Sequence, residues 1–426
     1  MHALPAQAPA RGANDRIQFA TIGVGIQGIN DTRAALRVPG VEIVAAADVY
    51  DGRLTLAKET WGEQVFTSRD YREVLARPDV DAVIIATPDH WHARIAIDAM
   101  KAGKDVYVEK PIVQDIEEGP QVIEVERQTK RILQVGSQRV SSIVYAKARD
   151  LFKAGAIGEL NLVEAWMNRN SANGAWQYSI PPDASPATID WDRFIGNAPK
   201  RPFEPIRLFR WRNYRDYGTG IPGDLFVHLF TGIHFVLSSF GPTRIMATGG
   251  LRYWNDGRDV PDVMLALYDY PKTATHPAFT LALKVNFANG GGNDQAFRFI
   301  GPDGMLTLTG GAVTLSRRAR PKDPGTTADT FAKAMQDAYM KEHRAKYPED
   351  PELLPTSEEV HAAPAGYSES VEHFKTFFDA VRARRAVVED ASFGYRAAAP
   401  ALLTNESYFD SKPVGWNPER MKRTQN

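Results

Sequence analysis

Short apolar runs alternate with amphipathic stretches between residues 16 and 136, and this alternation constrains the fold more than any other feature of the sequence. Continuous apolar strands that alternate with helices indicate a parallel sheet with both faces covered. We therefore predict an α/β fold that begins with a doubly wound parallel sheet. The expected strands span residues 17–22, 41–47, 81–86, 105–109 and 131–136, and the expected helices include 27–37, 53–61, 92–102 and 116–130.

The pattern changes after residue 140, where strands follow one another with short turns. This order favours a largely antiparallel sheet, so we predict a second domain of the α+β class. Its expected strands span residues 160–167, 264–270, 279–288, 296–301 and 304–310, with helices at 142–154, 330–347 and 372–385. The predicted division is an unstructured tail (1–15), a nucleotide-binding domain (16–140) and an α+β domain (141–426) with a surface insertion (317–370).

The composition excludes several classes of function. The 426 residues include 51 Lys and Arg against 52 Asp and Glu, so we expect no nucleic-acid partner. The absence of cysteine excludes disulfides, thiolate catalysis and cysteine zinc sites. The longest apolar stretch, residues 225–240, is shorter than the ~20 residues of a membrane span and holds two histidines, so we expect no membrane insertion.

A glycine fingerprint lies directly after the first expected strand. Residues 23–28 form a G-x-G-x-x-G pattern that opens a helix, and an aspartate ends the next strand twenty residues later. This context is typical of dinucleotide binding, in which the helix N-terminus receives the pyrophosphate and the carboxylate receives ribose hydroxyls. The alternative is a set of turn glycines in a domain that binds no nucleotide. The predicted cofactor-binding residues are Gly23, Gly25, Ile26, Gln27, Gly28 and Asp48.

The fingerprint also predicts which nucleotide binds. A carboxylate at position 48 repels the 2′-phosphate of NADP, so NAD is the expected cofactor and NADP the less favoured one. Arg53 lies five residues further on and softens this preference.

A loop rich in aromatic and polar residues follows the third expected strand, at the sheet edge where doubly wound folds bind ligands. Asp89 is a candidate helix cap, but two histidines and a tryptophan favour contact with the cofactor. A metal site is not predicted, because no third ligand accompanies the histidines. The residues expected to bind the cofactor are Thr87, Pro88, His90, Trp91 and His92.

Glu109 and Lys110 form a loop with Pro111 directly after the next strand, and both are predicted to bind the cofactor. A lysine fixed at this edge is expected beside the reactive end of the cofactor. The alternative is a charge pair that faces solvent.

Asp224 and His228 lie in a segment that is first glycine-rich and then helical. Their spacing of four residues places them on one helix face, where a carboxylate can orient an imidazole and raise its basicity. The alternative for Asp224 is the favourable charge at a helix N-terminus. His234 lies off this face and is expected to be structural.

The glycine fingerprint, Asp48, the Thr-Pro-Asp-His-Trp-His loop and Glu109-Lys110-Pro111, in this order and spacing, resemble the Gfo/Idh/MocA family. The resemblance implies a Rossmann domain followed by an α+β domain with a large, open, mostly antiparallel sheet. It also implies an enzyme that oxidises sugars or cyclitols with NAD(P). The implied catalytic residues are Lys110, Asp224 and His228, with Gln138 near the nicotinamide ribose and Arg139 close by.

Aromatic, amide and guanidinium groups upstream of Asp224 suit a sugar ring, although each is equally compatible with the core or the surface. The predicted substrate-binding residues are Lys110, Trp166, Asn168, Arg212, Tyr214, Asp224 and His228.

Three functions follow from these residues. The first is NAD-dependent oxidation of a secondary hydroxyl of a sugar, glycoside or cyclitol. The second is glycoside cleavage through transient oxidation at C3, elimination and retained NAD; the intact Glu-Lys-Pro favours the first. The third is sugar binding without catalysis, against which the complete Lys110, Asp224 and His228 set argues. The resemblance also implies a homo-oligomer, a dimer or tetramer. The Ala- and Pro-rich start suggests a periplasmic or secreted protein, with a cytoplasmic one as the alternative.

Overall fold

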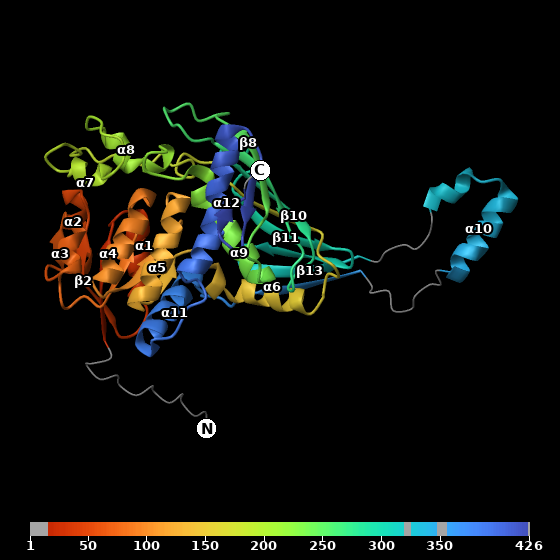
Figure 1. Ribbon diagram of the computed structural model, residues 1–426, viewed down its shortest axis with the longest axis horizontal. Helices are drawn as coiled ribbons and strands as arrows, with labels where there is room; N and C mark the ends of the chain where they lie inside the picture. The colour runs from red at the N-terminus through yellow and green to blue at the C-terminus, as the bar shows by residue number, and fades with distance from the viewer. Residues whose placement is uncertain (1–15, 319–324, 347–355, 425–426) are drawn as a thin grey trace, which may run out of the picture.

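Two sheets organise the molecule, one in each half of the chain (Figure 1). The computed structural model describes residues 16–318, 325–346 and 356–424. The tail predicted at residues 1–15 lies outside the described residues.

The first sheet has six parallel strands in the order β3-β2-β1-β4-β5-β6, which confirms the predicted doubly wound sheet. The strand order reverses between β1 and β4, and such a reversal opens a crevice at the carboxyl ends of the strands. The strands are β1 (Ile17–Ile22), β2 (Val41–Ala47), β3 (Phe66–Ser68), β4 (Ala82–Ile85), β5 (Asp105–Val108) and β6 (Leu133–Val135).

Helices cover both faces of this sheet, and one of them comes from the C-terminal half of the chain. The apolar stripe of α11 packs Phe374 and Phe378 on Phe19 of β1 and on Tyr107 of β5. The predicted boundary at residue 140 therefore does not separate two independent cores. The helices are α1 (Ile26–Ala35), α2 (Asp51–Trp61), α3 (Tyr71–Leu75), α4 (His92–Lys101), α5 (Gly119–Thr129) and α11 (Glu369–Ala383).

The second sheet has ten strands, and all its neighbouring pairs are antiparallel except β7 with β10. This confirms the mostly antiparallel sheet. Residues 357–362, expected in a surface insertion, form the edge strand β14. In spatial order the strands are β14 (Ser357–Ala362), β13 (Ala312–Arg317), β12 (Gly304–Thr309), β11 (Asp294–Gly301), β7 (Leu162–Asn168), β10 (Phe279–Asn286), β9 (Val263–Tyr270), β8 (Arg244–Gly250), β15 (Val414–Asn417) and β16 (Lys422–Arg423).

One face of the second sheet carries helices and the other is open. Alternate side chains of β9 and β10 enter the core beneath the helices, whereas Leu265 and Leu267 of β9 are 45% and 52% exposed on the other face. The covering helices are α6 (Ile143–Lys153), α9 (Val227–Leu237) and α12 (Ala391–Asp410).

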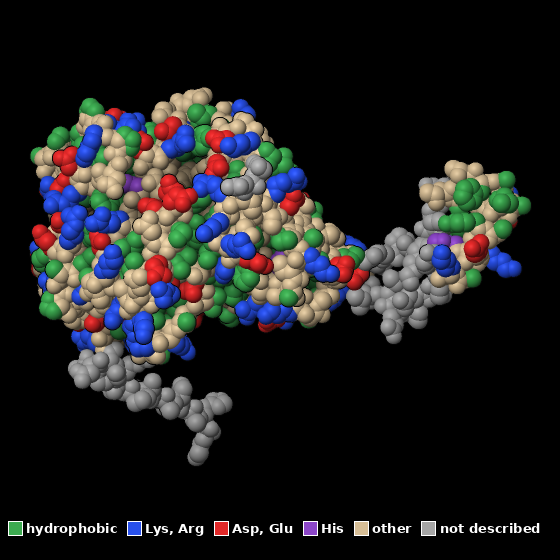
Figure 2. Space-filling view, viewed as in Figure 1, with side chains coloured by type: hydrophobic (Ala, Val, Ile, Leu, Met, Phe, Trp, Pro, Cys, Tyr) green, Lys and Arg blue, Asp and Glu red, His purple; other side chains and the backbone are tan. Residues whose placement is uncertain are grey.

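Helix α10 (Lys333–Lys346) stands apart from the body of the molecule (Figures 1 and 2). Phe331 before the helix, and Met335 and Tyr339 within it, keep large exposed surfaces. The helix predicted at residues 330–347 is therefore present, and it carries an apolar stripe away from the core.

Residues 169–217 extend across the carboxyl edge of the first sheet, where α7 (Trp191–Ile195) and α8 (Pro205–Phe209) lie above its helices (Figure 1). Tyr50 pairs with Ile189 in a β-bridge, and its hydroxyl donates to Asp183 at 2.5 Å. The Trp91 indole donates to the carbonyl of Phe194 at 3.0 Å. We call residues 169–217 the roof, because these bonds fix the segment over the edge where a doubly wound sheet binds its ligand.

Glu389 lies where the two halves of the core meet. Its carboxylate accepts hydrogen bonds from the hydroxyls of Ser137 and Thr231, and its backbone carbonyl accepts from Val135 of β6. The side chain is buried, and its Oε2 atom has no hydrogen-bond partner. Burial raises the pKa of this carboxyl to about 8, so the proton stays on the folded protein at neutral pH.

Because this proton is buried, the stability of the folded chain should depend on pH. The folded chain keeps the proton at pH values where the unfolded chain has lost it. The contribution of this carboxyl to the free energy of unfolding is therefore complete below about pH 4.5 and is lost as the pH rises towards 8. The glutamine of Glu389→Gln cannot titrate. Between pH 5 and pH 8, the free energy of unfolding of this variant should therefore rise by about 2–4 kcal/mol relative to that of the unaltered chain. Urea denaturation across this range measures the gain. Glu63→Gln, at an exposed position, is the control; pH curves that run parallel for Glu389→Gln and the unaltered chain would contradict the assignment.

Candidate active site

The glycine fingerprint forms a turn that leaves no room for side chains at two of its three positions. Gly23 has φ +92°, and a Cβ there would lie 2.6 Å from the carbonyl oxygen of Ala86. A Cβ on Gly28 would collide with the carbonyl oxygen of Gly23, because α1 packs closely on β1. At Gly25, which caps α1, the nearest atoms belong to the mobile end of the Arg53 side chain, 3.6 Å away. This arrangement fits a pyrophosphate at the helix N-terminus.

Asp48 ends β2 beside this turn, as predicted, but its carboxylate already has partners in the chain. One oxygen accepts from the backbone N–H of Val24 at 2.8 Å, and the other accepts from Tyr50 at 3.0 Å. Arg53 lies 3.4 Å from the first oxygen, with its guanidinium over the ring of Phe209 in the roof. The carboxylate therefore fixes the turn as well as facing the cavity beside it.

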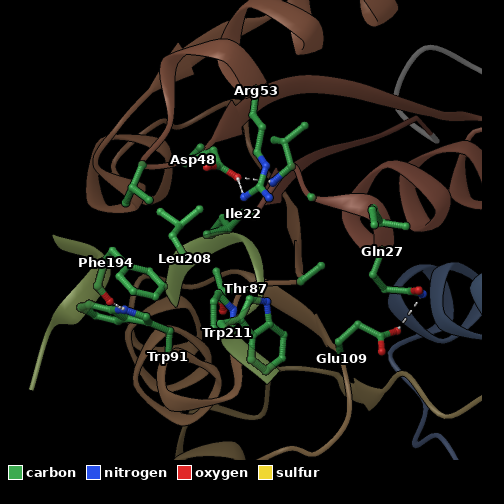
Figure 3. Close-up of a pocket in the computed structure, with 18 of the residues that line it drawn as sticks. Ile22, Gln27, Asp48, Arg53, Thr87, Trp91, Glu109, Phe194, Leu208 and Trp211 are labelled. Atoms are coloured by element: carbon green, nitrogen blue, oxygen red, sulfur yellow. Dashed lines mark hydrogen bonds and ion pairs between the residues drawn. The ribbon is translucent and has the colours of Figure 1, made fainter. Parts of the chain in front are cut away.

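A cavity of about 570 Å³ opens between this turn and the roof, within the size range of ligand sites (Figure 3). The first domain contributes the fingerprint, Asp48 and Arg53 on one side and Glu109 with Lys110 on another. The roof contributes mainly aromatic and apolar side chains on the opposite wall. The roof residues of this wall are Asn173, Tyr178, Ser179, Pro181, Arg193, Phe194, Leu208, Phe209, Trp211 and Arg212.

The Thr87–His92 loop contributes to the cavity, with one exception. Thr87, Pro88, Asp89, Trp91 and His92 line it. The two ring nitrogens of His92 lie 2.8 and 2.7 Å from the carbonyl oxygens of Thr87 and Pro111. His90 does not line it.

His90 is therefore a correction to the predicted cofactor site. Its Nε2 lies 2.8 Å from the carbonyl of Phe194, and its ring packs against Tyr217 and Phe194. Burial lowers the pKa of this imidazole to about 4, so the neutral ring serves to anchor the roof.

Lys110 and Asp224 come from different halves of the chain and meet in a buried ion pair. The ammonium of Lys110 donates to Asp224 Oδ1 at 2.8 Å and to the Asp224 carbonyl at 3.0 Å. Arg212, which stacks on Trp211, donates through Nε to the same Oδ1 at 3.0 Å. Burial alone would raise the pKa of Asp224, but the charges of Lys110, Arg212 and Arg169 outweigh it and hold this pKa well below its usual range.

His228 is close to this ion pair but is not held by it. Residues Pro222–Phe226 form a π-helical turn before α9, so Asp224 and His228 are not one turn apart on a regular α-helix, as the sequence had suggested. The Nδ1 atom of His228 is buried and has no hydrogen-bond partner. Burial and the charges of Lys110 and Arg139 hold the pKa of this imidazole well below its usual range, so the ring is neutral. Asp224 therefore positions Lys110 and Arg212, a correction to its expected role on His228.

Glu109 has a buried acidic neighbour. Gln27 donates to Asp31 at 2.8 Å and lies 3.5 Å from Glu109. Burial raises the pKa of Glu109 to about 7, and burial together with the charge of Glu109 raises the pKa of Asp31 well above its usual value. Two carboxyls this close share a proton. With one proton between them, the two carboxyls together carry one negative charge beside Lys110.

The remaining predicted residues are distributed over three places. Gln138 donates to the carbonyl of Gly136 at 2.7 Å and does not line the cavity. Trp166 lies on the open face of the second sheet, where its indole donates to Asp294 at 2.5 Å. Tyr214 is buried in the core of the roof beneath Arg207. These positions correct the expectation that Trp166 and Tyr214 line the substrate site, since neither side chain faces the ion pair.

A second cavity, of about 550 Å³, contains residues that sequence reasoning largely missed. Asn168, a predicted substrate residue, lines it together with Tyr145, Arg139, Arg169 and Glu369. Arg169 and Glu369 lie in no recognisable motif, so no sequence signal singled them out. Among residues 16–318, 325–346 and 356–424 there is no group of three or more His, Asp or Glu side chains that could hold a metal ion, and no helix there has the length and apolarity of a membrane span.

Comparison with known families identifies the first domain. Residues 17–137 match the Gfo/Idh/MocA model, described as an oxidoreductase family with an NAD-binding Rossmann fold. The chain is 31% identical over 182 residues to an alpha-N-acetylgalactosaminidase of Shewanella oneidensis, covering 38% of this chain and 39% of that protein. It is 32% identical over 167 residues to an inositol 2-dehydrogenase of Salmonella typhimurium, covering 39% and 49%. The chain thus spans less than half the length of these curated relatives.

Solved structures resemble the whole chain. A levoglucosan dehydrogenase in complex with NADH and levoglucosan has a TM-score of 0.68 at 17% identity, covering 94% of this chain and 99% of that one. A scyllo-inositol dehydrogenase from Lactobacillus casei with bound NAD(H) and scyllo-inositol has a TM-score of 0.63 at 20% identity, covering 94% and 99%. At these identities the likeness establishes a common fold. The likeness to the Gfo/Idh/MocA oxidoreductase family, described by its NAD-binding Rossmann fold, is thus carried by residues 17–137.

Proposed function

We propose that this chain is an NAD-dependent oxidoreductase that oxidises a secondary hydroxyl of a sugar, glycoside or cyclitol. The observation that carries the proposal is the buried Lys110–Asp224–Arg212 group at the wall of the cavity that holds the glycine fingerprint. Relatives named as inositol 2-dehydrogenase and solved structures named as levoglucosan and scyllo-inositol dehydrogenases support the substrate class.

NAD fits the first cavity. The open position over Gly25 and the start of α1 would receive the pyrophosphate, and Asp48 would receive the adenosine ribose. The carboxylate of Asp48 favours NAD over NADP, although Arg53 at 3.4 Å offsets part of its charge. When bound, NAD supplies a hydride acceptor.

The chain's own residues handle the proton and the developing charge. Lys110 Nζ, fixed by Asp224, would donate to the substrate hydroxyl oxygen and stabilise negative charge that develops there. The neutral imidazole of His228 would accept the hydroxyl proton. Arg212 balances the charge of Asp224, so Lys110 can turn towards a substrate without leaving that carboxylate unpaired.

Lys110→Met tests this assignment. The variant keeps most of the side-chain length but has no proton to donate, so kcat for sugar oxidation should fall ~10²–10⁴-fold. NADH absorbance with a panel of sugars and cyclitols measures the loss. Lys101→Met, at an exposed end of α4, is the matched control. A Lys110→Met enzyme with more than a tenth of the original kcat would remove Lys110 from the mechanism.

A specific observation supports a second candidate, glycoside cleavage with a retained cofactor. The roof covers the nucleotide cavity and is held to the first domain at Tyr50, Asp51, His90 and Trp91. A nucleotide enclosed in this way would leave slowly, which suits a reaction that oxidises the sugar transiently and returns the hydride. Relatives named as alpha-N-acetylgalactosaminidase and glycosyl hydrolase family 109 proteins support this candidate.

The enclosure predicts nucleotide retention for either candidate, and the reaction products distinguish the two. We expect about one NAD per chain to remain bound through gel filtration and to appear on denaturation, identified by chromatography as NAD and not NADP. Tyr50→Phe removes the bond to Asp183 and should increase the release rate several-fold, whereas Tyr253→Phe, at an exposed position, should not. Release of p-nitrophenol from nitrophenyl glycosides without net NADH would select glycoside cleavage. NADH beyond one equivalent per chain would select the dehydrogenase.

We also propose a homo-oligomer built on the open face of the second sheet. Met246, Leu265 and Leu267 expose 42–52% of their surfaces on adjacent strands of this face. Exposed apolar groups on neighbouring strands of a flat sheet are typical of an interface.

Leu267→Glu tests this interface. A charge at the centre of the apolar group should convert the oligomer to a monomer, as measured by light scattering after gel filtration. Lys58→Glu on α2 alters charge far from this face and serves as the control. An unchanged mass for Leu267→Glu would show that a different surface is used.

A further inference from the structure

Asp31 is a buried acid that the proposed mechanism does not use. It lies on α1, and only 2% of its surface is exposed. Gln27, one turn earlier on the same helix, donates to Asp31 Oδ1 at 2.8 Å, and the same amide nitrogen lies 3.5 Å from Glu109 Oε1. Figure 3 shows Gln27 and Glu109 side by side, away from Asp48. We call Asp31 and Glu109 the acid pair.

The packing around the acid pair favours a proton on it. Asp31 Oδ2 is buried and has no hydrogen-bond partner among the described residues. A buried carboxylate oxygen without a donor is costly, and protonation of the carboxyl reduces this cost. Glu109 Oε1 is enclosed by Gly136, where a Cβ would lie 2.4 Å from it. Because Glu109 also lines the first cavity, the acid pair connects a buried oxygen to the space where a nucleotide would bind.

The charges around the acid pair balance before a nucleotide binds. Lys110 and Arg212 carry two positive charges, and Asp224 carries one negative charge. The acid pair with one proton supplies the second negative charge. Burial raises the pKa values of the other two titratable groups that face it, so both are neutral at neutral pH. The groups that face the acid pair are Tyr107 on β5, Lys110 after β5, Arg212 in the roof, Asp224 before α9 and Glu389 before α12.

An oxidised nicotinamide ring would change this balance. The adenosine end of the nucleotide is assigned to Asp48, so the other end of a dinucleotide would extend towards Glu109 and Lys110. The ring carries one positive charge in NAD and none in NADH. A positive charge beside the acid pair favours its doubly ionised form, whereas a neutral ring favours the form with one proton. Both nucleotides bring the same pyrophosphate, so the difference between them comes from the ring alone.

We propose that the acid pair of Asp31 and Glu109 holds a proton when the nicotinamide ring is reduced and releases it when the ring is oxidised. The proposal rests on the proposed function and adds Asp31 as a positioning residue, which acts through Glu109. In alcohol oxidation the C–H bond breaks and its hydride goes to the ring, while the O–H proton leaves through His228. The acid pair gains one proton as the ring loses its charge, so the complex retains a proton that would otherwise enter the solvent. Return of the hydride reverses both changes.

The relative affinity for the two nucleotides tests the proposal without turnover. Because the NADH complex binds more protons, acid favours NADH over NAD. The chain is equilibrated with mixtures of NAD and NADH, and the fluorescence of bound NADH gives the ratio of the two Kd values. We expect this ratio to shift towards NADH by about five- to tenfold between pH 8.5 and pH 6, as a pKa difference of one to two units requires.

Infrared spectra identify the chemical group that carries the proton. A protonated carboxyl has a carbonyl stretch that a carboxylate lacks. The pKa of Glu109 is about 7, and a neighbouring positive charge lowers it. The spectrum of the NADH-loaded chain minus that of the NAD-loaded chain should therefore show a gain of about 0.4–0.5 carboxyl per chain at pH 7.

Asp31→Asn keeps the shape of the side chain but cannot share a proton. Its Kd ratio should stay within about twofold from pH 8.5 to pH 6, and the infrared gain should disappear. A merely structural role would weaken both nucleotides alike and leave the pH dependence of the ratio unchanged. Glu109→Gln is a second variant with the same expected loss. Glu389→Gln removes another buried proton nearby, and as the matched control it should keep both signals.

The outcomes separate this proposal from the function on which it rests. A Kd ratio that does not change with pH, in a chain that oxidises sugars, would overturn the proton-holding role while the oxidoreductase stands. A pH dependence that Glu389→Gln abolishes and Asp31→Asn retains would overturn the assignment to the acid pair. The expected pH dependence in a chain that turns over no sugar or glycoside would support the acid pair and overturn the catalytic function. A chain that binds neither NAD nor NADH would overturn both.

Discussion

The rest of the site depends on the bonds that the carboxylate of Asp224 accepts. It accepts from Lys110, which the first domain supplies, and from Arg212, which the roof supplies, so three parts of the chain meet at one oxygen atom. A buried charge without a partner costs several kcal/mol, roughly 3–5 when one member of a pair is removed. The pair therefore favours the relative position of sheet, roof and α9 that keeps all three groups together. It also fixes the direction of the Lys110 ammonium group.

The roof gives this charged group an enclosed environment. Its aromatic residues close one side of the nucleotide cavity, and its bonds to the first domain lie on the loops that follow the parallel strands. Electrostatic interactions strengthen where water is excluded, so the ion pair of Lys110 and Asp224 is stronger beneath the roof than it would be at an open edge. If the proposed function holds, the roof would link two properties that are usually separate, since the segment that shapes the substrate side would also slow the exchange of the nucleotide.

The first domain could be predicted from sequence because its determinants are local. A Cβ at Gly23 or Gly28 would collide with neighbouring backbone atoms. In addition, β1, β2, β4 and β5 each form a largely apolar run. Lys110 and Asp48 could be placed because parallel strands bring their carboxyl ends to one edge. The long helix α12 was missed, since Gly394 and Pro400 interrupt its pattern. Gly394 is there because Val135 of β6 packs against it, which only the folded chain reveals.

The second cavity could not be predicted, because it is assembled from residues that no motif joins. Arg139 follows β6, Arg169 follows β7 and Glu369 begins α11, and only the packing of α11 on the first sheet brings the third to the first. His90 shows a different kind of error. Its loop position is typical of ligand contact, but its side chain contacts the neighbouring roof segment instead. In this chain the glycine fingerprint follows from a short-range pattern, whereas the second cavity follows from contacts between segments that are far apart in the sequence.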